Sequence, residues 1–284
     1  MCPCWRCRHK ELNLDNGVLL MGIVNCTPDS FSDGGLYFDS TKAIKHAYRQ
    51  FEQGAHILDV GGASSRPGAD PVSPEEELRR VLPVVSELAG NSDLPVSVDT
   101  FSYEVAARCL DAGAVAVNDI TGLQSDARLA DLVAQSGAGL VLMHMRGAPK
   151  TMQMMTDYHN LEGEIKDFFQ IQVDLARSKG VEKEQIALDP GIGFSKTAEQ
   201  NLSIIKHLDR VRYESYPLLL GVSRKSFIGK VTGAEVNHRL MGTAGAVAAC
   251  IMNGTEIVRV HDVEEMREVS EIVNAIKRGT LDSG

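Results

Sequence analysis

Three polar residues stand at the ends of separate apolar segments, where they could bind a ligand. Asp99 ends VSVD, Asn118 ends VAVN and Asp189 ends IALD. A carboxylate beside a buried strand is costly unless it is paired or hydrogen-bonded. A 2-amino-4-oxo pyrimidine edge offers adjacent N–H donors, and each such charge-assisted contact contributes about 1.5–3 kcal/mol. We therefore expect these residues to bind a ring of this kind.

Each of these residues also has a purely structural interpretation. Asp189 opens an Asp-Pro-Gly turn, which is a common position for aspartate. The pairs Asp99–Thr100 and Asn118–Asp119 could cap the helices that follow them. The alternatives stay open for each residue singly, but three strand ends together favour a ligand site.

A second group of residues could bind an anion. Lys225 lies in the segment SRKS (223–226), and Arg259 and His261 lie in IVRVH (257–261). Two cations, an imidazole and free helix N–H groups suit a phosphate or pyrophosphate. The alternative is ordinary solvent-exposed charge. However, an unpaired Arg259 inside an apolar segment would be costly, so we expect an anion there.

Other familiar chemistries have less support. The chain contains no H-E-x-x-H, Walker A or G-x-S-x-G motif. The segment GIG (191–193) lacks the third glycine of a dinucleotide fingerprint. Met143, His144 and Met145 could be catalytic, but we expect methionine there to pack over a flat ring.

The elements that must position these residues repeat along the chain. Short apolar runs alternate with segments long enough for a crossover helix, and this pattern predicts a single-domain α/β protein, a (β/α)₈ TIM barrel over residues 16–280. In that fold, residues just past the strands converge on one mouth. The runs cover 18–25, 57–62, 96–100, 115–120, 140–144, 186–191, 218–224 and 256–261.

Helix signals agree with this scheme, and two connections are unusually long. These connections, at 26–39 and 61–73, are predicted to be binding loops or lids. A third irregular stretch, 145–160, follows the fifth run. Glycines near five predicted helix ends suit left-handed caps. The predicted helices cover 41–53, 73–88, 102–112, 125–136, 161–179, 197–208, 238–253 and 263–277.

The composition limits the partners and the location. The net charge of −9 over 284 residues opposes nucleic-acid binding. No apolar run reaches the roughly 18 residues that span a bilayer, and the N-terminus lacks the apolar region of a signal peptide. We therefore expect a cytoplasmic protein with small-molecule substrates and no membrane or nucleic-acid partner.

The first fifteen residues are expected to form a short tail that is frayed or disordered. Cys2, Cys4, Cys7 and His9 could hold zinc, but their spacing matches no common zinc finger. The frayed tail is the favoured interpretation.

Several ordered motifs resemble those of the dihydropteroate synthase family. The likeness runs from about Leu20 to Val263, and TPDSFSDGG and SRKSFIG are specific to that family. The matching segments are MGIVNCTPDSFSDGG, DVGGASSRPGA, VSVDT, VNDITG, LMHMRG, LDPGIGFSK, GVSRKSFIG and IVRVHDV. The resemblance implies condensation of 6-hydroxymethyl-7,8-dihydropterin pyrophosphate with 4-aminobenzoate, with Mg²⁺, by ionisation of the pterin CH₂–O bond and attack by the amine.

The resemblance also implies roles for individual residues. Asp99, Asn118 and Asp189 would hold the aminopyrimidine edge, Met143 would pack on the ring, and Lys225 would reach the pterin oxygen and ring nitrogen. Asn25 would bind Mg²⁺ and pyrophosphate, and Arg66, Arg259 and His261 would hold the anion. The loops and the aminobenzoate pocket would comprise Phe31, Asp33, Ser65, Arg66, Pro67, Phe194, Ser226 and the stem of Lys225. A homodimer formed through barrel helices is also implied.

The second loop departs from the family pattern. The family reads G-G-E-S-T-R-P-G, whereas this chain has Ala63 in place of the glutamate and Ser65 in place of the threonine. Ala63 supports one alternative, a catalytically silent pterin-binding paralogue. A methyltetrahydrofolate-dependent methyltransferase barrel, which shares the pterin pocket, is another. The presence of SRKSFIG and TPDSFSDGG argues against it, because a methyltransferase needs neither a pyrophosphate site nor an aminobenzoate pocket.

Overall fold

The apolar runs form a parallel barrel. The computed structural model describes residues 4–27, 40–64, 66, 68–91 and 93–281. Its larger sheet has the order β8-β7-β6-β5-β4-β3-β10-β9, and a parallel bridge between Leu188 and Leu218 joins the two edges. The predicted (β/α)₈ barrel is therefore confirmed. Its strands are β3 (Leu19–Asn25), β4 (Ile57–Gly61), β5 (Val96–Asp99), β6 (Ala116–Asp119), β7 (Gly139–Met143), β8 (Ile186–Asp189), β9 (Leu219–Leu220) and β10 (Ile257–Val260).

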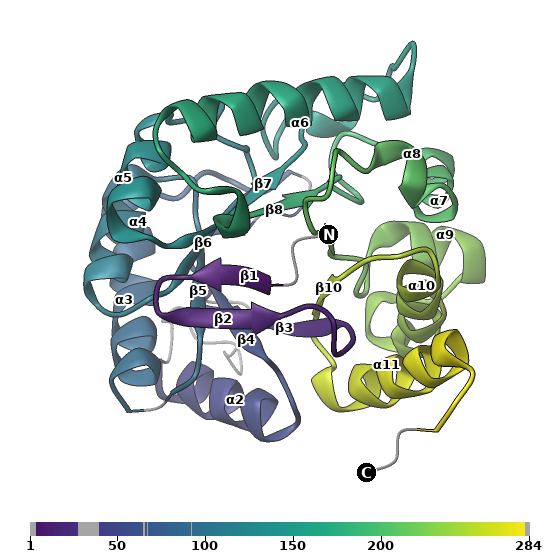
Figure 1. Cartoon of the computed structure of the whole chain (residues 1–284), viewed down its shortest axis with the longest axis horizontal. Helices are drawn as coiled ribbons and strands as arrows, with labels where there is room; N and C mark the ends of the chain where they lie inside the picture. The colour runs from purple at the N-terminus through teal and green to yellow at the C-terminus, as the bar shows by residue number, and fades with distance from the viewer. Residues whose placement is uncertain (1–3, 28–39, 65, 67, 92, 282–284) are drawn as a thin grey trace.

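Helices surround the barrel in the expected order (Figure 1). Two differences from prediction stand out: His207 divides the predicted helix 197–208 into two, and a short helix follows the SRK segment. The helices are α2 (Ser40–Glu52), α3 (Pro74–Asn91), α4 (Tyr103–Asp111), α5 (Arg128–Ser136), α6 (Leu161–Ser178), α7 (Ala198–Lys206), α8 (Leu208–Val211), α9 (Ser226–Thr232), α10 (Leu240–Met252) and α11 (Val263–Arg278). Within the described ranges, 3₁₀ turns cover Met152–Met154, Lys183–Gln185 and Val236–His238.

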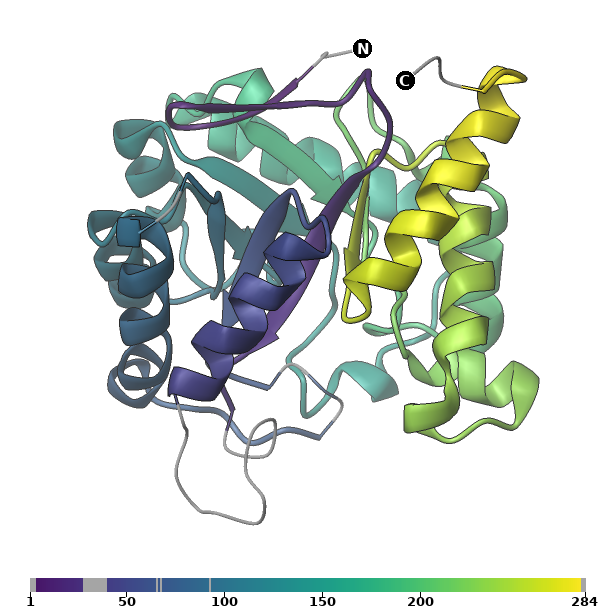
Figure 2. The same ribbon diagram turned by 90° about the horizontal axis from the view of Figure 1, so that it is seen from below.

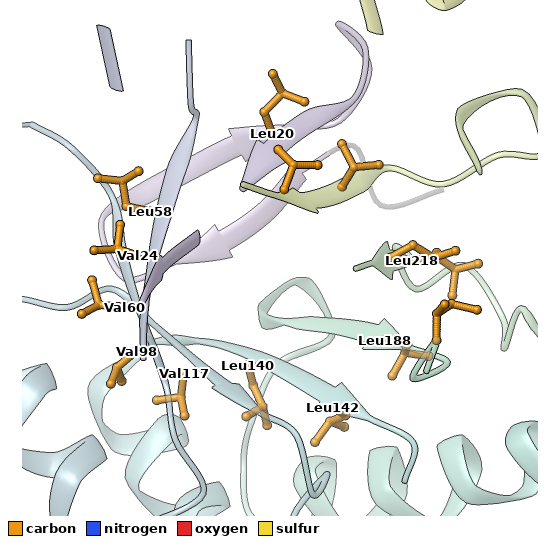
Figure 3. Close-up of a cluster of buried hydrophobic side chains, with 14 of the residues drawn as sticks. Leu20, Val24, Leu58, Val60, Val98, Val117, Leu140, Leu142, Leu188 and Leu218 are labelled. Carbon is orange, nitrogen blue, oxygen red and sulfur yellow. The ribbon is translucent and has the colours of Figure 1, made fainter. Parts of the chain in front are cut away.

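The two-residue period of each strand separates the main core from the barrel interior. On β4, Leu58 and Val60 belong to the large apolar cluster around the outside of the barrel, which Figure 3 shows. Ile57 belongs to a second cluster, inside the barrel at the N-terminal ends of the strands. Because side chains alternate along a strand, Asp59 points inward like Ile57, and Gly61 lies at the next inward position.

The N-terminal residues differ from the expected frayed tail. β1 (Cys4–Cys7) and β2 (Lys10–Asn13) pair as an antiparallel hairpin that lies across one end of the barrel (Figures 1 and 2). Trp5 is fully buried, and its indole Nε1 donates to the carbonyl oxygen of Gln185 over 2.8 Å. The apolar alternation of Trp5 and Cys7 supplies the buried face, so residues 4–13 close the barrel floor.

The hairpin also separates the cysteines considered as zinc ligands. Cys7 is buried whereas Cys4 is partly exposed, and an odd spacing along a strand puts the two on opposite faces. Cys2 lies outside the described residues. Across the part of the chain that the structure describes, no group of three or more His, Cys, Asp or Glu is arranged to hold a metal ion. In that same part, none of the helices has the length and apolarity to cross a membrane.

Candidate active site

Strand alternation gathers the predicted polar residues at the C-terminal end of the barrel interior. Asp99, Asn118, Asp189 and Arg259 each lie two residues beyond an inward position and therefore point into the barrel. Gly61, the register partner of Asp99, leaves room there, because a Cβ on it would lie 3.3 Å from Asp99 Cβ. The structure thus brings together four residues whose outermost members, Asp99 and Arg259, are 160 positions apart in the chain.

The guanidinium of Arg259 is the centre of this group. Its Nε donates to Asp59 Oδ2 over 2.6 Å, and its Nη2 donates to Asp99 Oδ2 over 2.8 Å. Burial raises the pKa of Asp99, while Arg259 lowers it and the charge of Asp59 raises it further. Arg259 is therefore paired within the apolar strand, as the cost of burying a charge requires.

Asn118 and its neighbour have separate tasks. Asn118 is almost fully buried, and its Nδ2 donates to Asp59 Oδ2 over 2.9 Å. Asp119 accepts hydrogen bonds from the backbone N–H groups of Thr121 and Leu123. These bonds shape the turn after β6, whereas the next helix, α5, begins only at Arg128 and has no side-chain cap. The helix-capping alternative for Asn118–Asp119 is therefore wrong, and Asn118 lies in the site.

The helix after Asp99 is capped by other residues. Ser102 accepts from the N–H of Val105, and Thr100 Oγ1 accepts from the N–H of Ser102. Asp99 takes no part in these bonds and is paired with Arg259. The capping alternative for Asp99 is therefore wrong.

Asp189 combines the two roles that the sequence left open. Its Oδ1 accepts from the N–H of Gly191 over 2.7 Å, which is the turn bond expected of Asp-Pro-Gly. Asp189 is also 95% buried inside the barrel. Burial raises the pKa of its carboxyl group, whereas the positive charge of Lys225 lowers it. One oxygen shapes the turn, and the carboxylate remains at the site.

Lys225 approaches the site from the start of α9. Its Nζ donates to the carbonyl oxygen of Ile192 and lies 4.6 Å from the centre of the Phe194 ring. Gly193 lets the aliphatic stem pass, since a Cβ there would lie 3.0 Å from Lys225 Cδ. Burial lowers the pKa of Lys225 to about 8.

An apolar wall faces these charges. Met143 and Phe194 belong to one small buried cluster with Ile120, Met145 and Met152. Met143 ends β7 at an inward position beside Asp189, its register partner on β8. Soft and aromatic side chains beside three hydrogen-bonding groups suit a flat heteroaromatic ring.

The predicted anion corner is less cationic than the sequence indicated. Arg224 is ion-paired with Asp262, so its charge is already balanced. His261 Nδ1 is hydrogen-bonded to Ser223 Oγ at 2.9 Å, and burial together with Arg259 lowers the pKa of His261 to about 3. The imidazole is thus neutral at pH 7 and can offer an N–H but not a positive charge.

The remaining predicted residues lie around this corner. Asn25 ends β3 beside Gly61, and Ser226 opens α9 with its side chain exposed. Arg66 is exposed and close enough to His261 to lower that residue's pKa. Phe31, Asp33, Ser65 and Pro67 lie outside the described residues.

Ala63 lines a cavity next to the site. Asp99, Ile120, Glu77 and Lys150 are among its other lining residues. Glu77 is buried and hydrogen-bonded to Thr100, and burial raises its pKa. A carboxylate therefore remains near the root of the second loop although residue 63 has none.

Two buried polar residues of the site were missed by sequence reasoning. Asp59 is fully buried between Arg259 and Asn118. Its position in ILDVG, two residues before the inward Gly61, carried a usable signal. Lys196 is 98% buried, and its Nζ is 2.9 Å from His144 Nδ1. Lys196 lies beyond the end of β8, so strand alternation could not have identified it.

Known proteins share this barrel and much of its sequence. The model of a family described as "Pterin binding enzyme" matches residues 21–261. A dihydropteroate synthase from Synechocystis sp. is 48% identical over 260 residues, which are 91% of this chain and 90% of that protein.

Two solved structures extend the comparison. A dihydropteroate synthase from Clostridium difficile, crystallised in the presence of pteroic acid, is 43% identical with a TM-score of 0.87, covering 92% of this chain and 97% of its own. A dihydropteroate synthase from Xanthomonas albilineans, solved with 4-aminobenzoic acid, is 38% identical with a TM-score of 0.89, covering 96% and 98% of the two chains.

The barrel, its buried carboxylates and these matches define the class: the chain belongs to the pterin-binding enzyme family. Within that family, the relatives that it matches over nine-tenths of its length are dihydropteroate synthases.

Proposed function

We propose that the barrel mouth joins 6-hydroxymethyl-7,8-dihydropterin pyrophosphate to 4-aminobenzoate, releasing pyrophosphate and forming 7,8-dihydropteroate. The observation that carries this proposal is the convergence of Asp99, Asn118, Asp189 and Lys225 opposite Met143 and Phe194. The chain is accordingly a dihydropteroate synthase, as its relatives are.

The hydrogen-bonding groups match the pterin edge. The carboxylate of Asp189 can accept from the exocyclic amine and the adjacent ring N–H. Lys225, which now donates to a backbone carbonyl, can donate instead to the pterin oxygen and ring nitrogen. Met143 and Phe194 would cover the ring, and these contacts exclude water from the reacting carbon.

The chemistry begins with ionisation of the pterin CH₂–O bond. The developing carbocation is delocalised over the ring, where Asp99 stabilises positive charge. The departing pyrophosphate is held by Arg259, by the neutral N–H of His261 and by Arg66. The neutral aromatic amine of 4-aminobenzoate then attacks the carbon and loses a proton. Stabilisation of separated charge by fixed groups carries the step.

The residues present fit a magnesium ion that arrives with the substrate. Mg²⁺ retains waters and is held by one or two protein oxygens together with substrate phosphates. The amide oxygen of Asn25, at the strand end beside the anion corner, is such a donor. When bound, the ion would neutralise charge on the pyrophosphate.

The loops and the quaternary structure complete the proposal. Ser65, Arg66 and Pro67, with Phe31 and Asp33, would close over the site, and Phe194, Ser226 and the stem of Lys225 would line the aminobenzoate pocket. A homodimer is supported by exposed apolar side chains on two adjacent helices: Met241 and Met252 on α10, Ile272 and Ile276 on α11. A cytoplasmic location is the accompanying proposal.

The decisive experiment measures pyrophosphate and dihydropteroate together. Purified protein would be supplied with Mg²⁺ and the pterin pyrophosphate, with and without 4-aminobenzoate, alongside the Ala63→Glu variant. Dihydropteroate formation that depends on 4-aminobenzoate is the expected result. Pyrophosphate release without product would mean that the second loop no longer captures the amine. No release of pyrophosphate, either with or without 4-aminobenzoate, would identify a silent pterin-binding paralogue.

A further inference from the structure

Asp59 occupies the centre of the site without belonging to the residues assigned to either substrate. It lies on β4, points into the barrel and is fully buried. Its Oδ2 accepts two hydrogen bonds, from Arg259 Nε over 2.6 Å and from Asn118 Nδ2 over 2.9 Å. One carboxylate oxygen therefore holds two side chains that are proposed to bind the pterin pyrophosphate.

The contact decides which way the Asn118 amide faces. An ionised carboxylate only accepts hydrogen bonds, so the amide must present its NH₂ group to Asp59. The carbonyl oxygen of Asn118 is then turned away from Asp59. It can accept an N–H from the aminopyrimidine edge of a ligand, which a flipped amide could not do.

The same carboxylate helps to fix the plane of Arg259. A guanidinium is planar and delocalised, so two carboxylates bound to different nitrogens determine its orientation. Asp59 holds Nε, and Asp99 holds Nη2. Without Asp59, Arg259 would keep one anchor instead of two.

We propose that Asp59 is a positioning residue for the pterin half of the reaction, orienting Asn118 and Arg259 towards the pterin pyrophosphate. This inference rests on the proposed function. It makes Asp59 act through its two neighbours, without contact to the reacting atoms.

The charge of Asp59 provides a readout that simple loss of packing would not produce. Asp99 is surrounded by Arg259, which lowers its pKa, and by Asp59, Glu77 and Asp119, which raise it. Removing the negative charge of Asp59 should therefore lower the pKa of Asp99. The acidic limb of the pH profile for the pterin substrate should move to lower pH.

The test uses Asp59→Asn in the full chain, with Ser97→Ala as the matched control. Ser97 is the register partner of Asp59, is equally buried, and no described residue hydrogen-bonds to its Oγ. Asp59→Asn should raise the KM for the pterin pyrophosphate roughly ten- to hundredfold. The KM of this variant for 4-aminobenzoate should change less than about twofold, because Asn118 and Arg259 are proposed to hold the pterin pyrophosphate and not 4-aminobenzoate.

A second variant guards against misfolding. Asp59→Ala leaves space for a small carboxylate, so added formate should restore affinity for the pterin pyrophosphate while chloride at equal ionic strength should not. Unchanged pterin KM and unchanged acidic limb in Asp59→Asn would overturn the inference. Failure of both variants to fold would make Asp59 a structural residue and overturn it as well.

The two proposals fail in different ways. A wild-type protein that forms no dihydropteroate would refute the proposed function. A fully active wild type whose Asp59→Asn variant binds the pterin normally would refute only the role of Asp59.

Discussion

Burial controls the charge of individual residues at the barrel mouth. Lys196 is buried and Lys225 is partly buried, and desolvation lowers the pKa of Lys225 to about 8 and that of Lys196 to about 7. His261 is neutral at pH 7 because burial and nearby arginines oppose its protonation. The site therefore contains fewer fixed positive charges than its count of basic residues indicates, and substrate binding should respond to pH near neutrality.

Lys225 should set the alkaline limit of pterin use. Below pH 8 its ammonium can donate to the pterin, whereas above pH 8 it becomes neutral and that charge-assisted bond weakens. The kcat/KM for the pterin pyrophosphate should fall as the pH rises past about 8. In Lys225→Arg the guanidinium stays protonated. The alkaline limb of the kcat/KM profile should therefore move to higher pH, even if the maximum value of kcat/KM is reduced. An unchanged limb in steady-state profiles would contradict this assignment.

Gly191 should be indispensable for the turn that carries Asp189. Its φ is +71°, and a Cβ there would lie 2.0 Å from the carbonyl oxygen of His144. Gly191→Ala should destabilise the protein by about 3 kcal/mol or more, measured by chemical denaturation. Gly233→Ala is the control, because φ is +73° there but nothing lies within 4 Å; it should cost only about 1–2 kcal/mol. Equal costs would show that backbone strain and not the close approach matters.

At the scale of elements, the N-terminal hairpin completes the barrel at the end opposite the site. Arg8 Nη1 donates to the carbonyl oxygens of Leu110 and Ala114, and the N–H of Arg8 donates to that of Gly137. These bonds join the hairpin to segments that precede the barrel strands. The hairpin should therefore affect stability but not chemistry.

Trp5→Ala tests this separation. Removing a fully buried indole should lower the free energy of unfolding by about 3–5 kcal/mol. The kcat of the folded fraction should be unchanged, since Trp5 lies at the far end of the barrel. Arg6→Ala is the matched control: its ion pair with Glu182 is partly exposed and should contribute about 1 kcal/mol or less. A selective loss of kcat in Trp5→Ala would show that the two ends are coupled.

The surface of α10 and α11, on the side of the molecule opposite to α4 and α5, carries several exposed apolar side chains. Figures 1 and 2 show α10 and α11 packed side by side. Met241 is 80% exposed on α10, and Ile272 is 63% exposed on α11. Exposed apolar side chains on neighbouring helices are typical of an interface between protein chains.

Dimerisation through this surface predicts a mass of twice 30.8 kDa in light scattering. The double variant Met241→Glu, Ile272→Glu should shift the protein towards the monomer, because charged groups would be buried at the interface. Ile171→Glu changes an equally exposed isoleucine on α6 and should leave the dimer intact. A monomeric wild type would refute the proposed interface.

The order of elements could be predicted because it depends on local pattern. Apolar runs bounded by glycine and polar residues mark the strands. The predicted runs contain the observed strands except at β7, which begins one residue before the predicted run 140–144. Helix α9 was missed because its seven residues carry too little local signal. The segment just before α9 is held by long-range hydrogen bonds instead. The N–H of Arg224 donates to Thr243 Oγ1, and Arg239 Nη1 donates to the carbonyl oxygen of Arg224.

The sequence by itself determined the barrel and the strand ends that bear Asp99, Asn118 and Asp189, because strand periodicity is a property of neighbouring residues. Only the tertiary structure decided which of these side chains pair with one another. The contact between Arg259 and Asp59 spans 200 positions, and no local pattern records it. The neutral state of His261 and the buried hairpin likewise depend on burial by distant segments, which exists only once the chain has folded.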